Sequence, residues 1–536
     1  MSHSRGLQVL IAGAGPTGLT LACELARRGV AFRLVEAQPR HFAGSRGKGL
    51  QPRTLEVFDD LGIVEPLLAS GAKYPRLRVW WRRFALARWS MFTQREPTPD
   101  VPYPNTWLVP QWRTEALLRE RLAGYGGAVE LATALTGFEQ DGDGVTATLS
   151  REGGTEQVRA SYLVGADGGH SFVRKALGVT FQGETYEGER MVVGDVQVEG
   201  LDREHWHVWP KTKGGAIALC PLPGTDHFQL YVKLPTGAEP PELSERGIQQ
   251  YFSESARPRP GIRIHSPSWL SLYRPNVRMV DRYRVGKVFL AGDAAHVHPP
   301  AGGQGLNTGI QDAYNLGWKL GQVLAGAPEA LLDTYEEERL PIAEHVLGLS
   351  SRLHRQASAS GGGLKPQRRG ADTQQLAISY RGGSLSYDEQ RQPGRLRAGD
   401  RAPDAPCHDA SGGAGRLFEV FRGTHFTLLA FGAAHASTVA HMAARFGPTV
   451  RALRLVRPGE PCQGADLVDS GGHARAAYDV RGAALVLVRP DGHVGLFASP
   501  GTPEQVEGYL QALLPAAGPT CDERHPDAEQ DEHALG

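Results

Sequence analysis

The segment from Leu7 to Ala37 restricts the fold most, because a glycine-rich turn there joins a buried strand to a helix. LQVLIAG (7–13) is a short, continuously apolar run, as in strands at the centre of a parallel sheet. PTGLTLACELARRG (16–29) has apolar residues along one helical face and ends at Gly29, and AFRLVEA (31–37) is a second strand. A β-α-β unit of this kind needs a parallel sheet covered by helices, which predicts an α/β fold.

The turn itself has the spacing G-x-G-x-x-G. Gly13 allows the tight turn, Gly15 lets a pyrophosphate approach the backbone, and Gly18 lets helix and strand come close together. The helix then directs its free N–H groups at the phosphates. Glu36, at the end of the second strand, is placed to bind ribose hydroxyls and disfavours a 2′-phosphate. The unit therefore predicts a site for NAD or for the ADP half of FAD, which also includes Pro16, Thr17 and Ala37.

Two further buried strands end in turns that contain glycine and aspartate. Asp167 and Gly168 follow YLVGA, with Arg174 on the next helix, and Gly292 and Asp293 follow KVFLA. Ligands bind at the carboxyl ends of parallel strands, so these turns are expected beside the first one. Asp293 would suit hydrogen bonds to a polyol such as the ribityl chain of a flavin. For the second turn, a plain strand–turn–helix junction would also explain the glycines.

Taken together, five segments resemble one enzyme family. GAGPTG with its downstream acid, SRGKGLQPRTLEVFDDLG (45–62), VPQ (109–111), GADGGHSFVRKALG (165–178) and GDAAHVHPPAGGQGLNTGIQDAYNLGWKL (292–320) occur in its order and spacing. The family is the single-component FAD-dependent aromatic hydroxylases, the para-hydroxybenzoate and phenol hydroxylase group. The resemblance runs from residue 7 to about 350, and the C-terminal part is more narrowly similar to the polyketide- and antibiotic-modifying hydroxylases.

The resemblance implies a tight, non-covalent FAD and NAD(P)H as a transient co-substrate. Only one dinucleotide fingerprint follows a strand in the sequence, which agrees with a visiting nicotinamide. In this family NAD(P)H reduces FAD, O₂ adds to give a flavin C4a-hydroperoxide, and one oxygen passes to an electron-rich ring. The expected substrate is therefore a large phenolic or polycyclic, polyketide-like aromatic compound.

The resemblance also implies roles for individual residues. Arg46 lies near the flavin and the access route of nicotinamide, and Gln111 touches FAD. The glycines of 302–305 would let the backbone approach the flavin ring, and the helix that starts near Gln304 would point its positive end at the flavin edge. The remaining implied positions are Asp167 and Arg174 at flavin and NAD(P)H contacts, Pro299 and Pro300 on the reaction face, Gly303 and Gly305 at the ring, and Leu306 and Asn307 as backbone donors to the pyrimidine edge.

Composition and resemblance together predict the domain organisation. A discontinuous Rossmann-like FAD-binding domain comprises 1–75, 108–180 and 284–355, interleaved with a β-rich substrate domain of 76–107 and 181–283. The Gly/Ser/Arg-rich stretch within 356–395 is a connection, 396–516 is a thioredoxin-like domain that lacks a C-x-x-C motif, and 517–536 is a polar, disordered tail.

Aromatic residues outside the motifs are candidates for the substrate pocket. Alternation in HWHVWP puts His205, His207 and Trp209 on one face of a strand, and Trp80 and Trp89 lie in an aromatic-rich strand region. The alternatives are a surface strand for the first group and ordinary packing on a sheet for the tryptophans. His296 and His298 are expected to make structural hydrogen bonds, and no metal site is expected. No obligatory acid or base is identified, so Arg46, Pro299 and Pro300 are the catalytic candidates.

The overall charge and the cysteines limit the remaining possibilities. Lys+Arg and Asp+Glu number 58 each, so nothing attracts the chain to nucleic acid or an anionic membrane. The five scattered cysteines indicate reduced thiols. Without a signal peptide or a 20-residue apolar run, a cytoplasmic protein without membrane spans is expected, and a homodimer is allowed.

Three alternative functions share the predicted fold or cofactor. Baeyer–Villiger oxygenation would use the same scaffold. A flavin-dependent halogenase would carry W-x-W-x-I-P, whereas Trp206-His207-Val208-Trp209-Pro210 has the wrong spacing and lacks the isoleucine. A non-catalytic flavin-binding scaffold would not need the complete set of glycine and aspartate motifs.

Overall fold

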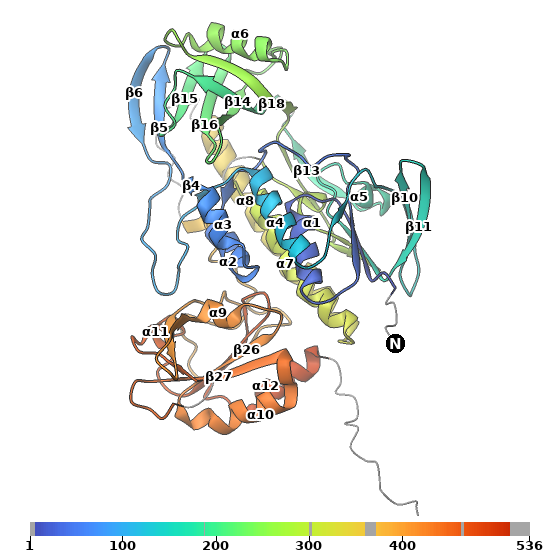
Figure 1. The fold of residues 1–536 in the computed structure, drawn as a ribbon, viewed down its shortest axis with the longest axis vertical. Helices are drawn as coiled ribbons and strands as arrows, with labels where there is room; N and C mark the ends of the chain where they lie inside the picture. Colours follow the sequence, from blue (N-terminus) through green and yellow to red (C-terminus); the bar gives the residue numbers. More distant parts are fainter. Residues whose placement is uncertain (1–5, 187, 300–302, 360–370, 463–465, 515–536) are drawn as a thin grey trace, which may run out of the picture.

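A computed structural model describes residues 6–186, 188–299, 303–359, 371–462 and 466–514, and it confirms the α/β fold class. Figure 1 shows three parts: a β-sheet part at the top, a central part, and a C-terminal part at the bottom. The long helices α7 (Gly305–Leu324) and α8 (Asp333–Ala359) run through the central part and approach both of the others.

The central sheet is built on the β-α-β unit. Its strand order is β20-β21-β12-β1-β2-β8, and all neighbours are parallel except β20 and β21. The strands are β1 (Val9–Ala12), β2 (Phe32–Val35), β8 (Val129–Glu130), β12 (Tyr162–Gly165), β20 (Arg284–Val285) and β21 (Val288–Leu290). Strand β1 is fully buried, as its continuous apolar run predicts. Helix α1 (Pro16–Ala26) follows it directly.

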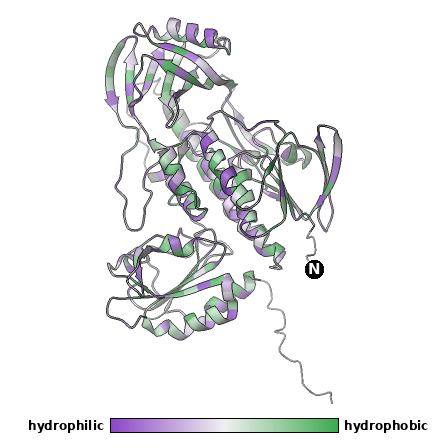
Figure 2. Ribbon diagram, viewed as in Figure 1, coloured by the Kyte–Doolittle hydropathy of each residue, from purple (hydrophilic) through white to green (hydrophobic). Residues whose placement is uncertain are grey.

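The upper sheet is antiparallel apart from one pair, β15 and β5, and has the order β18-β14-β17-β16-β15-β5-β6. Its strands are β5 (Arg76–Trp81), β6 (Phe84–Trp89), β14 (Met191–Glu199), β15 (His205–Thr212), β16 (Gly215–Pro221), β17 (His227–Lys233) and β18 (Arg263–Tyr273). Helix α6 (Glu245–Ala256) lies above it. Figure 2 shows hydrophilic and hydrophobic residues interleaved along α6, whose buried residues are Ile248, Phe252 and Ala256.

Smaller elements surround these two sheets. Three of them are three-stranded sheets. The first contains β3 (Gly49–Leu50), β7 (Trp107–Leu108) and β4 (Ala72–Lys73), the second β11 (Gly154–Ala160), β10 (Val145–Arg151) and β9 (Ala134–Gln140), and the third β13 (Phe181–Thr185), β19 (Asn276–Val280) and β22 (His296–Val297). The others are the helices α2 (Pro52–Asp60), α3 (Val64–Ser70), α4 (Gln111–Gly124) and α5 (Phe172–Ala176), and the 3-10 helices η1 (Gly292–Ala294) and η2 (Glu329–Leu332).

The C-terminal part contains a sheet of order β23-β30-β29-β26-β27-β28-β24-β25. Its elements are β23 (Tyr387–Gln390), β24 (Pro406–Asp409), β25 (Ala414–Arg416), α9 (Leu417–Phe421), β26 (Phe426–Phe431), α10 (Ala436–Phe446), β27 (Val450–Val456), β28 (Leu467–Val468), α11 (His473–Ala477), β29 (Ala484–Val488), β30 (Val494–Ser499) and α12 (Pro503–Leu513). Strands β26 and β27 are parallel, whereas β29 is antiparallel to both β26 and β30.

Of two predictions about this C-terminal part, one stays a prediction and the other needs a correction. The strand order supports the thioredoxin-like assignment, which stays a prediction. The segment 387–390, expected within the connection, instead pairs with β30 as β23 and so covers an otherwise open sheet edge. The predicted tail, 517–536, lies outside the described residues.

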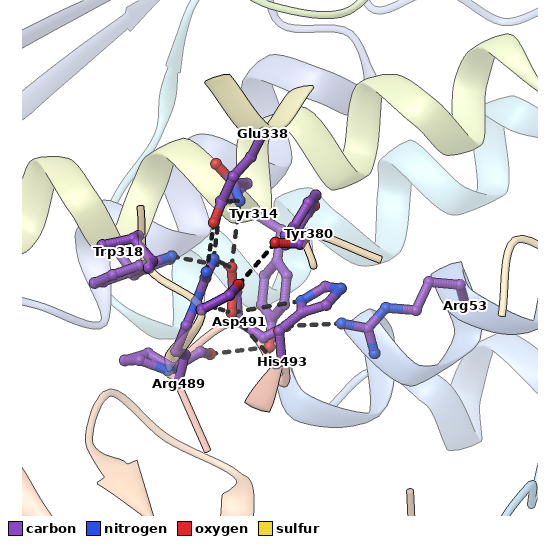
Figure 3. A network of polar contacts seen from close by, with 12 residues as sticks. Arg53, Tyr314, Trp318, Glu338, Tyr380, Arg489, Asp491 and His493 are labelled. Carbon is purple, nitrogen blue, oxygen red and sulfur yellow. Dashed lines mark hydrogen bonds and ion pairs between the residues drawn. The ribbon is translucent and has the colours of Figure 1, made fainter. Parts of the chain in front are cut away.

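Buried charges join the C-terminal part to the central helices (Figure 3). The Arg489 guanidinium donates to both carboxylate oxygens of Glu338 on α8, at 2.5 and 2.9 Å, and to Asp491 at 2.5 Å. Trp318 on α7 donates from Nε1 to Asp491 at 3.2 Å, and Arg53 on α2 donates to the Asp491 carbonyl at 2.7 Å. All five of these residues are buried, so the contact is an interior one.

Candidate active site

One large cavity lies between the central and upper sheets. Its volume is 2290 Å³, and it extends from the carboxyl ends of β1, β2 and β12 to one face of the upper sheet. Most of the predicted cofactor residues line it: Gly13, Gly15, Pro16, Thr17, Glu36, Ala37, Arg46, Gln111, Asp167, Asp293, Gly303, Gly305 and Leu306. The catalytic candidate Pro299 lines it as well.

The three glycines of the first turn have different surroundings. Gly13 has φ +102°, and a Cβ there would lie 2.4 Å from the Ala166 carbonyl oxygen. A Cβ on Gly18 would lie 1.9 Å from the Gly13 carbonyl oxygen, which is the predicted close contact of helix and strand. A Cβ on Gly15, in contrast, would meet nothing within 4 Å, although Gly15 lines the cavity. The space beside Gly15 is therefore open toward the cavity.

This open space fits the phosphates of a dinucleotide. Gly15 is the N-cap of α1, Pro16 occupies the first turn, and no side chain caps the helix. The first N–H groups of the helix are thus left for a ligand, and the helix dipole favours an anion there. Glu36 accepts hydrogen bonds from the backbone N–H groups of Ala14 and Gln38, each at 3.0 Å. It therefore fixes the turn and still has lone pairs for ribose hydroxyls.

The loop that carries Arg46 is held from two sides. Gln111 accepts from the Gly47 N–H at 2.9 Å and donates to Glu115, one helical turn further along α4, at 2.8 Å. Burial raises the pKa of the Glu115 carboxyl to about 7. On the other side, Gln229 of the upper sheet donates to the Ser45 carbonyl. Helix α4 and the upper sheet thus position the Arg46 loop jointly.

Asp293 follows β21 on a tightly fixed turn. Its side chain is open to solvent on the cavity side, and the surrounding protein raises the pKa of its carboxyl by desolvation. The preceding residue, Gly292, has φ +61° and donates its N–H to Asp312 at 3.1 Å. Asp312 also contacts His296 Nε2 at 2.6 Å and accepts from Arg339 at 2.8 Å. A buried charge cluster therefore supports the turn from behind.

Four of the predicted cofactor residues lie behind the cavity wall. Gly18 and Gly292 shape the turns from the inside. Arg174 was predicted at a cofactor contact, which the structure corrects: it is 5% exposed, and its guanidinium donates to the carbonyls of Ala294 at 2.9 Å and Gly169 at 2.8 Å. Asn307 donates from its side chain to Gly49 and Gly303, both at 2.8 Å. Both side chains hold neighbouring backbone instead of facing the cavity, and Pro300 lies outside the described residues.

The predicted aromatic pocket lies on the wrong face of β15. Trp206 lines the cavity, whereas His207 and Trp209 point to the opposite face, which α6 covers. There the ring of Phe252 on α6 packs edge-on against the Trp209 ring, with 5.1 Å between the ring centres. Of the candidates, Trp80, Trp89, His205, His207 and Trp209 are all absent from the cavity wall among the described residues. Trp80 donates to His207 at 3.0 Å, and Trp89 lies on the edge strand β6, two strands away from Trp206.

Sequence reasoning missed several residues of the cavity. Its aromatic wall consists of Trp206, Tyr74, Trp269 and Tyr231, and the Lys48 ammonium lies 4.3 Å from the centre of the Trp206 ring. Trp206 carried a usable signal, since the alternation in HWHVWP defines two faces and only one was considered. Glu115 also had one, because it stands four residues after Gln111 on the same helix. Tyr74 and Trp269 had none.

The described residues offer neither a metal centre nor a membrane-spanning helix. No cluster of three or more His, Cys, Asp or Glu side chains there could hold a metal ion. Within the same residues, no helix combines the length and the apolar character needed to cross a bilayer.

Comparison with known proteins places the chain in a family. Residues 6–350 match the family described as "FAD binding domain", and residues 396–517 match "Aromatic-ring hydroxylase, C-terminal". A flavin-dependent monooxygenase of Mycobacteroides abscessus is 47% identical over 92% of this chain and 98% of its own length. The 6-methylpretetramide 4-monooxygenase of Streptomyces rimosus is 34% identical over 97% of each chain.

A solved structure agrees with these matches. Aklavinone-11 hydroxylase in a ternary complex with FAD and aklavinone superposes with a TM-score of 0.81 at 29% identity, covering 96% of this chain and 100% of that one. The expected resemblance is thereby confirmed, and with it FAD as the cofactor. The glycine turn as the place where FAD binds stays a prediction. The chain belongs to the family of FAD-dependent aromatic-ring monooxygenases.

Proposed function

We propose that the protein uses NAD(P)H and O₂ to hydroxylate a large phenolic or polycyclic aromatic compound of the polyketide type, in the cytoplasm. The observation that supports this most is the continuity of the cavity, in which the glycine turn and the aromatic wall of Trp206 and Trp269 enclose one space of 2290 Å³. Of the proteins reported above, one is named for its action on 6-methylpretetramide, and the solved structure holds aklavinone beside FAD.

Different residues of the cavity would bind the cofactor and the substrate. The α1 N-terminus and Glu36 would hold the ADP half of FAD, and Asp293 with the N-terminus of α7 would hold the flavin half. When bound, FAD supplies the redox chemistry, because its flavin is reduced by NAD(P)H and then activates O₂. The aromatic wall then orients the ring to be oxygenated and excludes water, and orientation of this kind can supply much of the rate.

The test is a turnover experiment on the purified protein. We expect a yellow protein with a flavin spectrum, and oxidation of NADPH or NADH that accelerates when a polycyclic phenol is added. The product should gain one oxygen by mass spectrometry, with NMR distinguishing a new hydroxyl from an inserted ring oxygen. The proposal would be contradicted by a protein that never retains FAD, or by a rate of NAD(P)H oxidation that no aromatic compound increases.

Replacing Asp293 by alanine should weaken FAD retention. The carboxylate faces the cavity, and the loss of hydrogen bonds to a charged group corresponds to roughly 10- to 100-fold in affinity. Equilibrium dialysis of the apoprotein against FAD measures the change. Asp143→Ala in the exposed β9–β10 turn is the matched control and should bind FAD like the wild type. An unchanged affinity in Asp293→Ala would show that this aspartate does not contact the cofactor.

A further inference from the structure

Glu115 is a buried carboxyl group on the cofactor side of the cavity. It is 3% exposed and lines the cavity from α4, one helical turn after Gln111. The other acids of the described cavity wall follow strands of the central part, and they are Glu36, Asp167 and Asp293. Four carboxyl groups are thus gathered in the part of the cavity that is predicted to receive an anionic cofactor.

Hydrogen bonds fix the orientation of the Glu115 side chain. The Gly47 N–H donates to Gln111 Oε1 at 2.9 Å, and the amide NH₂ of Gln111 donates to Glu115 Oε1 at 2.8 Å. Glu115 Oε1 is therefore an acceptor whether or not the carboxyl group is ionised. The other oxygen, Oε2, accepts no hydrogen bond from the described residues, and Arg119 Nη1 lies 3.8 Å from it. Oε2 is thus the oxygen that can carry a proton.

The surroundings of Glu115 hold it close to the balance between its two forms. Desolvation raises the pKa of this carboxyl group to about 7. Its ionised form is favoured by the Gln111 hydrogen bond and by two cations, Arg119 on α4 and Arg46 on the loop before β3. Glu36, at the end of β2, acts in the opposite direction because like charges repel. A further negative charge beside Glu115 would therefore favour the neutral acid.

FAD brings such a charge, because its pyrophosphate is a dianion at neutral pH. We propose that Glu115 is a neutral carboxylic acid in the holoenzyme, and that FAD binding is coupled to the uptake of one proton at its Oε2 atom. The proton comes from solvent and returns there when FAD dissociates. The neutral group can donate a hydrogen bond, where a carboxylate would repel the cofactor. Neither NAD(P)H nor the aromatic substrate takes part in this linkage, so it does not depend on the proposed function.

The pH dependence of FAD release from the holoenzyme tests the proposal. The holoenzyme is diluted and the released FAD is followed by its fluorescence, which gives the Kd at each pH. Below pH 7 Glu115 is already protonated before FAD binds, so the Kd should change little. Above pH 7 each FAD that binds takes up a proton, so the Kd should rise by up to about 10-fold per pH unit.

Variants assign the proton to its residue. Glu115→Gln keeps the shape of the neutral acid without the titrating group. Its Kd should hardly change with pH, and at about pH 8.5 it should bind FAD about 10-fold more tightly than the wild type. Glu120→Gln on the same helix is the matched control, because that side chain is 62% exposed, and it should keep the wild-type pH dependence. His41→Gln should keep it too, although His41 shares the cavity wall and has a pKa lowered by burial and by Arg119.

Three results overturn the proposal. They are a wild-type Kd that does not rise above pH 7, a rise that persists in Glu115→Gln, and a rise that disappears in His41→Gln. A folded Glu115→Gln protein that binds FAD more weakly than the wild type at about pH 8.5 also contradicts it, because the ionised carboxylate would then be the form that binds. If Glu115→Gln does not fold, Arg119→Met decides the question. Without that cation the rise in Kd should begin at a higher pH, and an unchanged onset contradicts the proposal.

Discussion

Valine at position 15 is expected to leave the fold intact and to weaken FAD binding strongly. Gly15 has φ −73°, which any residue adopts, and a Cβ there meets no protein atom within 4 Å. The added side chain would instead occupy the space beside the N-terminus of α1, where the phosphates are predicted to bind. We expect FAD affinity to fall by about 100-fold or more, a loss near 3 kcal/mol. FAD titration and urea unfolding of the apoprotein measure the two properties separately.

Gly18→Val is the contrasting variant. Its Cβ would lie 1.9 Å from the Gly13 carbonyl oxygen, so the helix and the strand would have to move apart. We expect the apoprotein to lose about 3 kcal/mol of unfolding free energy. If Gly15→Val unfolds as readily as Gly18→Val, or if it binds FAD normally, the assignment of the phosphate position is wrong.

Arg489→Met is expected to destabilise the protein by about 3–5 kcal/mol. Arg489 is fully buried, and it neutralises Glu338 and Asp491 across the boundary between the C-terminal and central parts. Methionine fills most of the volume of the arginine side chain but removes the positive charge beside the two carboxylates. Lys319, whose ammonium lies 2.7 Å from Glu338, compensates for only part of that lost charge. The change in the urea midpoint, followed by circular dichroism, gives the size of the effect.

The control for this variant is Arg445→Met, an exposed arginine on α10 of the same C-terminal part. It should change the unfolding free energy by less than about 0.5 kcal/mol. An effect of Arg489→Met as small as this would mean that water reaches the network and solvates the carboxylates.

The cofactor half of the site was predictable because its constraints are local. Gly13 and Gly18 leave no room for a Cβ, whereas Gly15 keeps the space beside the helix N-terminus open. The strand ends at Asp167 and Asp293 follow from the geometry of parallel sheets. Arg174 shows the limit of motif reasoning. Its place in the motif was read correctly, but only the packing of α5 against η1 shows that its guanidinium faces the Ala294 carbonyl.

The substrate half was less predictable because distant elements decide it. Alternation along β15 separates Trp206 from His207 and Trp209, yet the covered face is decided by α6, which begins at Glu245. Similarly, Glu338 and Arg489 lie 151 residues apart, so no local sequence pattern predicts that they form an ion pair.

The buried boundary between the C-terminal part and the helices α2, α7 and α8 has a consequence for gene recombination among relatives. An exchange of C-terminal segments with a crossover between α8 and β23 would separate Arg489 and Asp491 from the Glu338, Trp318 and Arg53 that they contact. Chimeras should therefore function only when both parents share these five residues, or when the crossover transfers the contact partners as a set. The two segments behave as one unit of inheritance, although the sequence divides them into separate domains.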